Sequence, residues 1–340
     1  MMKKIATMGA ILTIAFMGGA DALQYSSGRS AFKLNMSGSA GFIEPDFESP
    51  LFLGDFDIHA QYNYAVARGQ TLGLVYSWDA DDLDGREYVH DAFALWEIRD
   101  IGRIEVGLTD SVAHKLGVGI PDVGGLRMNH KPLFYKKIAP HGTVIPGTSV
   151  DSGNDAPRIN IVSTPTNVGQ YGLSVAAFGD EYDYAVDGGV KFRFPNGKLK
   201  SALSLGASFI DNPHNFSTAS YLPDVTADWR AQGSVGFNIQ YNSWIWGTSA
   251  LVIYDEKPVG IASDGVSAGT GISYDVLNYS VSLSYIYSKT GIWHNDFEKY
   301  YVHTGIASVR YKYSENLSWW ASVGITSETP FLSTALKLAF

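Results

Sequence analysis

Several features are scarce or absent in this chain of 340 residues, and each absence excludes a class of protein. The sequence contains no cysteine, which excludes a disulfide framework and a thiolate metal site. Charged residues make up only 17%, below the about 25% that is usual for soluble chains. No internal run of about 18 apolar residues occurs, which excludes a transmembrane helix. The formal net charge of −9 disfavours nucleic acid as a partner.

The first 22 residues have the three-part layout of a secretory signal peptide. Lys3 and Lys4 precede an apolar run at 5–17, two glycines break the run, and Ala20–Ala22 has the small-x-small pattern of a cleavage site. A short buried helix is the alternative interpretation. We expect cleavage after Ala22, so that the chain from residue 23 onward leaves the cytoplasm.

Period-two alternation of apolar and polar residues runs through the rest of the sequence. In 56–67, for example, aromatic and aliphatic residues occupy the even positions and polar residues most of the odd ones. This is the periodicity of strands with one apolar and one polar face, and no long segment has helical spacing. Sixteen such runs are predicted as strands: 31–41, 55–67, 70–79, 87–98, 102–109, 157–163, 170–179, 183–194, 198–210, 228–241, 244–254, 266–276, 279–288, 300–313, 317–326 and 331–340.

The connections between these runs alternate between long and short. Short turns occur at 68–69 and 242–243, whereas long connections occur at 42–54 and above all at 110–156. An up-and-down meander in a membrane has this alternation, with one end trimmed and the other elaborated. The pattern also predicts that both chain ends lie on the side of the short turns.

The charged residues fall out of phase with the apolar residues of their strands. This phase alone does not separate a soluble barrel or sandwich from a membrane barrel with charge in its lumen. Sixteen strands in one meander, however, enclose a lumen too wide for a packed core. Aromatic residues gather at strand ends, as at Trp244 and Trp319, and the last strand ends in Phe340. These observations predict an all-β fold, a sixteen-stranded antiparallel up-and-down transmembrane β-barrel over 23–340.

Two motifs resemble a known family. The stretch DAFALW at 91–96 with GRIEVGL at 102–108 is similar to the hairpin before the constriction loop of bacterial outer-membrane porins. The stretch RINIVSTP at 158–165 resembles the strand that follows that loop. The hairpin departs from the family pattern at 108–110, where Leu-Thr-Asp replaces the more usual Gly-Arg or Gly-Asn. The resemblance is to general porins of Gram-negative bacteria, of the sixteen-stranded, trimeric, alphaproteobacterial type.

The resemblance implies a function and a setting. It implies a water-filled channel, and not an enzyme, for passive diffusion of small hydrophilic solutes and ions. The channel would be a homotrimer in the cell outer membrane, in contact with lipid and lipopolysaccharide. The barrel-insertion machinery would recognise Phe340 as an assembly signal. The segment 110–156, too long for an ordinary hairpin connection, would be the constriction loop, the third loop, folded into the barrel.

Charged residues of this loop and of the facing wall are the candidate lining of the constriction. Loop acids facing wall bases across a narrow gap would act on a passing solute with little screening. The alternative is that most of these residues only solvate the lumen. The loop candidates are Asp110, Lys115, Asp122, Arg127, Asp151 and Asp155, and the wall candidates are Lys33, Arg103, Arg158, Lys191, Arg193, Arg230 and Lys337.

No cofactor or tightly bound metal is expected. The glycines of 117–125 are not followed by a helix, as a dinucleotide site requires. The acidic run with Asp79, Asp81, Asp82 and Asp84 lacks the glycine position and closing glutamate of a calcium loop, so we expect at most a loosely bound divalent cation there. Alternatives to a diffusion porin are a substrate-selective channel, a barrel enzyme or a surface adhesin, although no spacing of Ser and His singles out a catalytic trio.

Overall fold

The structure is a computed structural model. It describes residues 23–45, 51–81, 86–121, 123, 150, 156–178, 183–212, 225–226, 228–256, 259–260, 265–294, 296–327 and 329–339. The expected signal peptide at 1–22 and the terminal Phe340 lie outside these residues, so both remain predictions.

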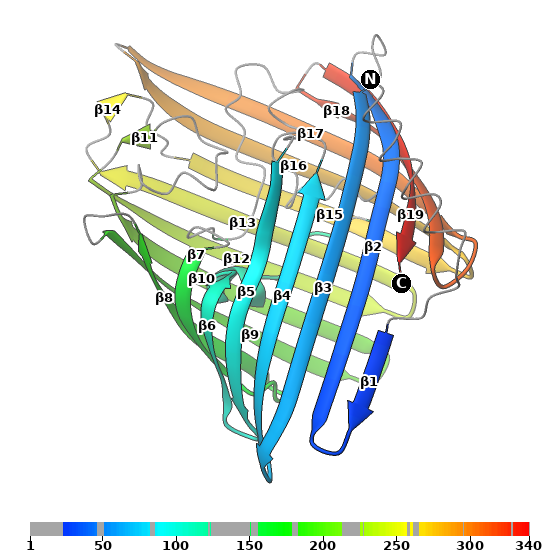
Figure 1. The fold of residues 1–340 in the computed structure, drawn as a ribbon. Coiled ribbons are helices and arrows are strands. Elements are labelled where there is room, and N and C mark those ends of the chain that lie inside the picture. Colours follow the sequence, from blue (N-terminus) through cyan, green and yellow to red (C-terminus); the bar gives the residue numbers. More distant parts are fainter. Residues whose placement is uncertain are drawn as a thin grey trace.

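Sixteen antiparallel strands form a closed barrel in the part of the chain that the structure describes (Figure 1). Each strand pairs with the next along the chain, and β19 returns to pair with β2 from Ala339–Ser37 to Phe331–Pro45. The fold class and all sixteen predicted strands are therefore confirmed. The strands are β2 (Ser30–Pro45), β3 (Leu51–Ala67), β4 (Gln70–Asp81), β5 (Arg86–Ile98), β6 (Gly102–Thr109), β7 (Ala156–Ser163), β8 (Gly169–Phe178), β9 (Asp183–Asn196), β10 (Leu199–Asp211), β12 (Trp229–Tyr241), β13 (Trp244–Glu256), β15 (Gly265–Val276), β16 (Tyr279–His294), β17 (Asp296–Lys312), β18 (Leu317–Thr326) and β19 (Thr329–Ala339).

The structure also contains strand segments that the sequence pattern did not predict. A short strand β1 (Leu23–Ser27) pairs with the first residues of β2. Two-residue strands β11 (Val225–Thr226) and β14 (Val259–Gly260) pair inside expected loops. The predicted loop at 289–299 is wrong, because β16 and β17 continue to within one residue of each other. Beyond the membrane both faces of a hairpin meet water, so its sequence need not alternate.

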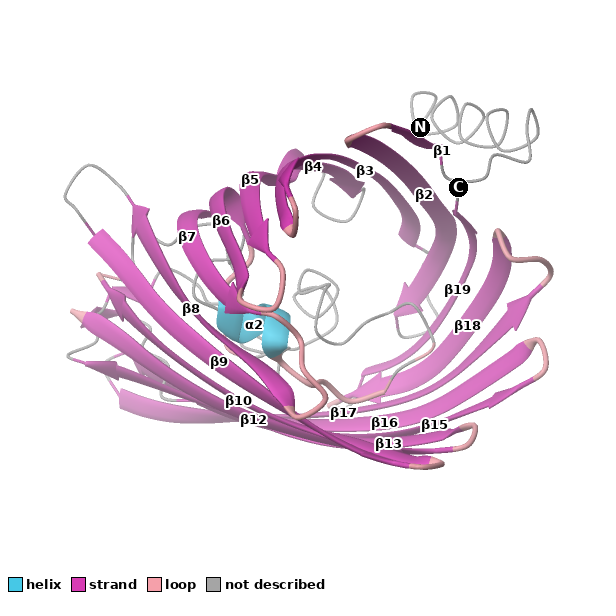
Figure 2. Cartoon of the chain, turned by 90° about the horizontal axis from the view of Figure 1, so that it is seen from below, coloured by secondary structure: helices cyan, strands magenta, loops and turns pink. Residues whose placement is uncertain are grey.

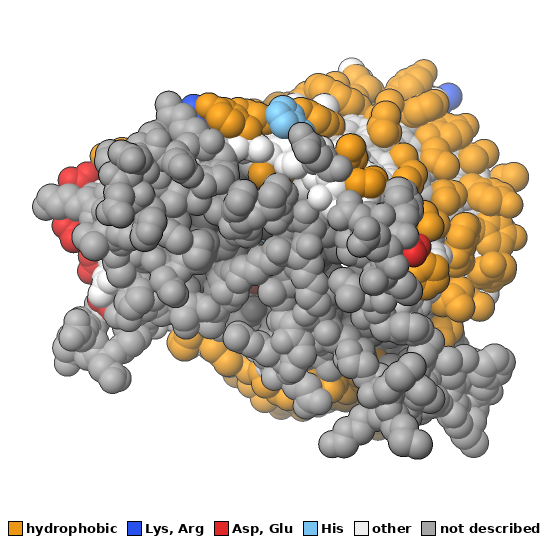
Figure 3. All heavy atoms as spheres, turned by 90° about the horizontal axis from the view of Figure 1, so that it is seen from above, with side chains coloured by type: hydrophobic (Ala, Val, Ile, Leu, Met, Phe, Trp, Pro, Cys, Tyr) orange, Lys and Arg blue, Asp and Glu red, His pale blue; other side chains and the backbone are white. Residues whose placement is uncertain are grey.

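The two faces of the wall have opposite chemistry. Along β16 the outward-facing Leu283 is 60% exposed, whereas the inward-facing Ser284 is 2% exposed. The same phase repeats around the ring, and Figure 3 shows hydrophobic side chains over the visible outer surface. A soluble barrel would place this apolar surface inside. The wall is thus built to face lipid outside and polar groups inside.

Aromatic side chains form a band at each end of the outer surface. At the turn end, the ring centroids of Trp244 and Tyr274 lie 4.4 Å apart. At the loop end, Trp229 lies 5.7 Å from Phe209 and 5.4 Å from Tyr254. Such amphipathic rings prefer the level of the lipid headgroups. The two bands therefore mark the two surfaces of the bilayer.

One short helix, α2 (Val112–Leu116), lies inside the ring of strands (Figure 2). Among the described residues no helix is long and apolar enough to cross a membrane. The helix follows β6 directly and begins the long connection to β7. Its contacts with the wall define the candidate site.

Candidate functional site

The chain between β6 and β7 enters the barrel and follows the inner wall as far as the structure describes it. Ser111 caps the start of helix α2, and its Oγ accepts a hydrogen bond from the His114 backbone N–H at 3.1 Å. Val112 and Leu116 form a buried cluster with Val162 of β7. Beyond α2, residues 117–123 continue along the wall toward β16. We call residues 111–123, without the undescribed residue 122, the wall segment.

The wall segment lies on inward-facing glycines, which we call the glycine track. Within the track, Gly172 pairs with Gly189 and Gly189 with Gly206, and further round Gly247 pairs with Gly271. A methyl group at these positions would meet Val112, Ala113, Val118 or Pro121. The absence of side chains therefore lets the backbone of the segment approach the sheet closely. The track consists of Gly172, Gly189, Gly206, Gly236, Gly247 and Gly271.

Hydrogen bonds fasten the wall segment along its whole described length. They join backbone groups of the segment to short polar side chains of the wall, which fixes both its height and its direction. Each of these bonds joins residues that are far apart in the sequence. They are Ala113 N–H to Asp187 Oδ1 at 2.9 Å, Val118 N–H to Ser204 Oγ at 2.8 Å, Val123 N–H to Ser282 Oγ at 3.0 Å, and Ser284 Oγ–H to the Pro121 carbonyl at 3.2 Å.

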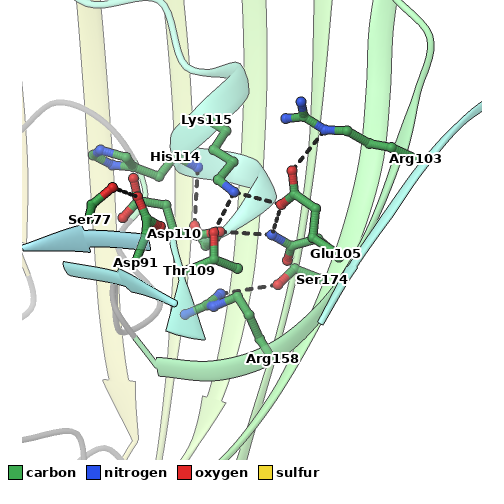
Figure 4. Close-up of polar contacts among 12 residues, drawn as sticks. Ser77, Asp91, Arg103, Glu105, Thr109, Asp110, His114, Lys115, Arg158 and Ser174 are labelled. Carbon is green, nitrogen blue, oxygen red and sulfur yellow. Dashed lines mark hydrogen bonds and ion pairs between the residues drawn. The ribbon is translucent and has the colours of Figure 1, made fainter. Parts of the chain in front are cut away.

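Glu105 of β6 is the centre of a polar cluster at the root of the segment (Figure 4). The Lys115 Nζ lies 2.6 Å from Glu105 Oε2, and the Arg103 Nε lies 2.8 Å from Oε1. Asn160 Nδ2 donates to the same Oε2 at 2.8 Å, and Lys115 also bonds Thr109. The Glu105 side chain is only 1% exposed. A carboxylate with this burial needs such partners to remain charged.

A second buried ion pair holds the start of α2. Arg158 of β7 and Asp187 of β9 approach to 3.1 Å, and both side chains are fully buried. Arg158 also donates to Ser174 Oγ, while Asp187 accepts the Ala113 backbone N–H. Removing one partner of such a pair leaves an uncompensated charge. Asp187 thus couples the wall to the helix.

A third ion pair lies nearer the loop end. Arg230 of β12 makes two hydrogen bonds to Asp255 of β13, at 2.7 Å from Nε and 2.9 Å from Nη2. This two-point geometry is the strong form of an arginine–carboxylate contact. It joins two wall strands and involves no residue of the wall segment.

The predicted lining residues fall into four groups. Arg103, Arg158 and Arg230 are inward-facing and paired with wall acids. Lys33, Lys191, Arg193 and Lys337 also face inward but have no ion pair in the part of the chain that is described. Asp110 accepts a bond from Asn160 through its carbonyl, and Lys115 contacts Glu105. The loop candidates Asp122, Arg127, Asp151 and Asp155 lie outside the described residues.

In the described ion pair between loop and wall, the acid and the base are exchanged relative to the expected arrangement. We expected loop acids to face wall bases, but the described loop–wall ion pair joins the loop base Lys115 to the wall acid Glu105. The described wall bases that are paired have wall acids as partners. A constriction lined by the predicted residues therefore stays a prediction.

Sequence reasoning missed several residues that organise the site. Glu105 and Asp187 were assigned to the polar face but not to the loop contacts, and Asn160, Asp255 and the glycine track were not singled out. The alternation of apolar and polar residues places these residues on the inner face of the wall. It does not show which strands the loop crosses, so their contacts with the loop could not be predicted. No cluster of three metal-ligating side chains occurs among the described residues. The side chains of Asp79, Asp81, Asp82 and Asp84 lie outside them, so the loosely bound cation stays a prediction.

A closed sixteen-stranded barrel, apolar outside and polar inside, with a segment packed on its inner wall, is the architecture of bacterial porins. No protein-family model matches the sequence, and no curated protein matches it. Solved structures do match. They include OmpT, an outer membrane protein of Vibrio cholerae, in a trimer form, with a TM-score of 0.68 and 12% identity over 92% of this chain and 100% of that one.

Two further matches carry the word porin or a porin name. The anion-selective porin from Comamonas acidovorans matches with a TM-score of 0.60 and 11% identity, over 92% of this chain and all of that one. OmpF of Salmonella typhi, in complex with daunomycin, matches with a TM-score of 0.63 and 10% identity, over 94% of this chain and all of that one. At such identities the likeness establishes the fold, which is that of porins.

Proposed function

We propose that the chain is an outer-membrane porin, a water-filled channel for passive diffusion of small hydrophilic solutes and ions. The observation that carries the proposal is the opposite chemistry of the two wall faces in a closed ring of sixteen strands. A barrel of this size encloses more space than its side chains fill. The serines, amides and charged groups on the inner face would keep that space wet.

The wall segment supports the same function. It is fastened to one side of the lumen by its hydrogen bonds and by the glycine track, and it follows the wall as far as it is described. A segment held in this way reduces the cross-section without depending on a moving part. We therefore propose a permanently open channel with a fixed narrowing.

We propose a homotrimer in the outer membrane, in contact with lipid and lipopolysaccharide and assembled by the barrel-insertion machinery. The solved trimer of similar fold supports the trimer, and the apolar outer surface with its two aromatic bands supports the membrane setting. The signal for insertion is expected at Phe340.

We further propose that the barrel is not an enzyme. In the described lumen, Ser77 lies between His59 Nδ1 at 2.8 Å and Asp91 Oδ2 at 3.4 Å. A hydrolytic triad needs the histidine in the middle, bonded to both the nucleophile and the acid. Here the serine donates to the carboxylate, so the histidine does not act as a base oriented by an acid.

Planar-bilayer recordings test the channel. The folded protein should insert in steps and conduct, and a trimer should insert in groups of three. In liposome swelling, neutral sugars should enter at rates that fall smoothly with their size and do not saturate with concentration. A saturating rate for one sugar would favour the alternative of a substrate-selective channel. Folded, heat-modifiable protein that never conducts would contradict the proposal.

A further inference from the structure

Fixed charges on the inner wall are sorted by sign along the barrel. Among the described residues, bases outnumber acids within five residues of the turn-side end of a strand, whereas acids outnumber bases farther toward the loops. The turn-side set is Lys33, Arg103, Arg158, Lys191, Arg193, Lys200, Arg310, Lys312 and Lys337 with the acids Glu97, Glu105 and Asp275. The loop-side set is Asp57, Asp91, Asp110, Asp183, Asp187, Asp228 and Asp255 with the base Arg230, while Lys115 of α2 lies between the two sets.

Near the turns lies a cluster of bases that form no ion pair with the described residues. Lys191 and Arg193 face inward from β9, and Lys200 faces inward from β10, which pairs with β9 in this region. None of the three has a carboxylate within ion-pair distance among the described residues. The cluster therefore retains its positive charge toward the lumen.

Near the loops, some wall carboxylates have hydroxyl groups and not bases as their described partners. Asp57 accepts a hydrogen bond from Ser37 at 2.8 Å, and Asp91 accepts one from Ser77 at 3.4 Å. Hydroxyl donors stabilise a carboxylate but do not cancel its charge. The base Arg230 at this end is already engaged by Asp255. The described part of the loop-side wall thus carries fixed charge of the opposite sign.

We propose that the lumen is a bipolar conductor that rectifies ionic current, with the cation-rich half at the loop end and the anion-rich half at the turn end. The proposal rests on the proposed function, because it requires an open channel. Anions are the preferred ions at the turn mouth, where Lys191, Arg193 and Lys200 concentrate them. The net acidity of the whole chain does not reveal this separation.

The direction of rectification follows from the sign order. When the loop side is positive, the field drives cations inward from the acidic half and anions inward from the basic half. Both ions then accumulate where the halves meet, and conductance rises. When the polarity is reversed, both ions leave the junction, and conductance falls.

Screening by salt sets the range of salt concentrations in which rectification should be observed. The Debye length is about 10 Å at 0.1 M and about 3 Å at 1 M. At 0.1 M the wall charges act across much of the lumen, whereas at 1 M they act only at its surface. We therefore expect rectification that disappears as the salt concentration rises.

The experiment is a current–voltage curve of single channels whose orientation is known. The variant Lys198→Cys carries its only thiol in the exposed turn between β9 and β10. A bulky neutral maleimide that cannot cross the barrel, added to one chamber, reports which side the turns face. At 0.1 M salt, where screening extends about 10 Å, we expect about 1.5- to 2-fold more current with the loop side positive than negative. At 1 M the curve should be linear.

Two sets of variants test the cause. Lys191→Gln with Arg193→Gln and Lys200→Gln, and separately Asp57→Asn with Asp91→Asn, should each bring the ratio at 0.1 M close to one. The control Lys289→Gln removes an outward-facing base that lies over the Tyr301 ring and should leave the ratio unchanged. A linear curve of the wild type at 0.1 M, or rectification of the opposite sense, would overturn the inference while leaving the channel intact. Absence of any conductance would instead overturn the proposed function.

Discussion

The inner wall holds the wall segment in two different ways. Over β6 to β9 the contacts are ionic: Glu105 with Lys115, and Asp187 with Arg158 and the start of α2. Over β15 and β16 they are neutral: Ser282 and Ser284 bond backbone groups of the segment, and Gly271 gives it room. The first region anchors the segment through buried charge, and the second guides it by shape and single hydroxyl groups.

This difference indicates where the segment is hardest to displace. Buried ion pairs are costly to break singly, because the remaining charge stays buried without a partner. Single hydroxyl contacts add only modest free energy each. We therefore expect the segment to be held more strongly at its root than at its far end.

The largest effect should follow from breaking the buried pair. Asp187→Ala leaves Arg158 buried without its carboxylate and removes the acceptor of the Ala113 N–H. We expect a loss of about 3–5 kcal/mol in the free energy of unfolding, measured by denaturant titration with the gel-mobility shift as readout. Glu315→Ala, an exposed turn residue, is the control. A loss of the same size in both variants would contradict the anchoring role.

An intermediate effect should follow from filling the glycine track. A Cβ atom at Gly236 would collide with the Val118 carbonyl, whereas a Cβ atom at Gly233, on the outward face of the same strand, would meet no atom within 4 Å. We compare Gly236→Val with Gly233→Val. Overpacking costs about 1–3 kcal/mol, and we expect this loss only for Gly236→Val. Single-channel conductance should also change in that variant alone. Equal behaviour of the two variants would mean that the segment does not lie on the track.

A smaller effect should follow from removing the far hydroxyl contact. Ser284→Ala loses the bond to the Pro121 carbonyl, at about 1 kcal/mol. Ser234→Ala is the matched control, because Ser234 faces inward without a bond to the segment among the described residues. Current noise should rise in Ser284→Ala only, since the far end of the segment then moves more. If Ser284→Ala destabilised the barrel as much as Asp187→Ala, the two regions would not differ.

Cysteine labelling compares the two wall faces by the accessibility of a thiol, and not by stability. The chain has no cysteine of its own, so each introduced thiol is the only one. In Arg193→Cys the thiol should react with a small charged reagent and alter the conductance. In Phe192→Cys, the adjacent outward position, lipid should shield the thiol. A reversed pattern would exchange the inside and outside of the barrel.

The sequence was sufficient to predict the fold because the period-two pattern persists through every membrane-crossing strand. Leu283 and Ser284 show why: one meets lipid and the other the lumen, so each position has its own chemical requirement. The predicted loop at 289–299 failed because a hairpin in water has no such requirement.

The site was less predictable, since phase identifies inward residues but not their neighbours across the lumen. Asp187 and Ala113 are 74 positions apart and meet only because the segment turns inward at β6. The same holds for Val123 and Ser282, which are 159 positions apart. Such contacts depend on the path of the chain, and a local pattern carries no information about that path.

The pairing of β2 has a consequence for how the barrel forms. One edge of β2 is shared, with β1 along Ser30–Leu34 and β19 along Ser37–Pro45. The pairing of β2 with β19 joins residues separated by nearly the whole chain. Its formation therefore has the largest entropic cost of loop closure among the described strand pairs. Contacts of that kind form late and limit the folding rate. We therefore expect the pairing of β19 with β2 to be the last step of folding. This step closes an open sheet into a barrel with a pore.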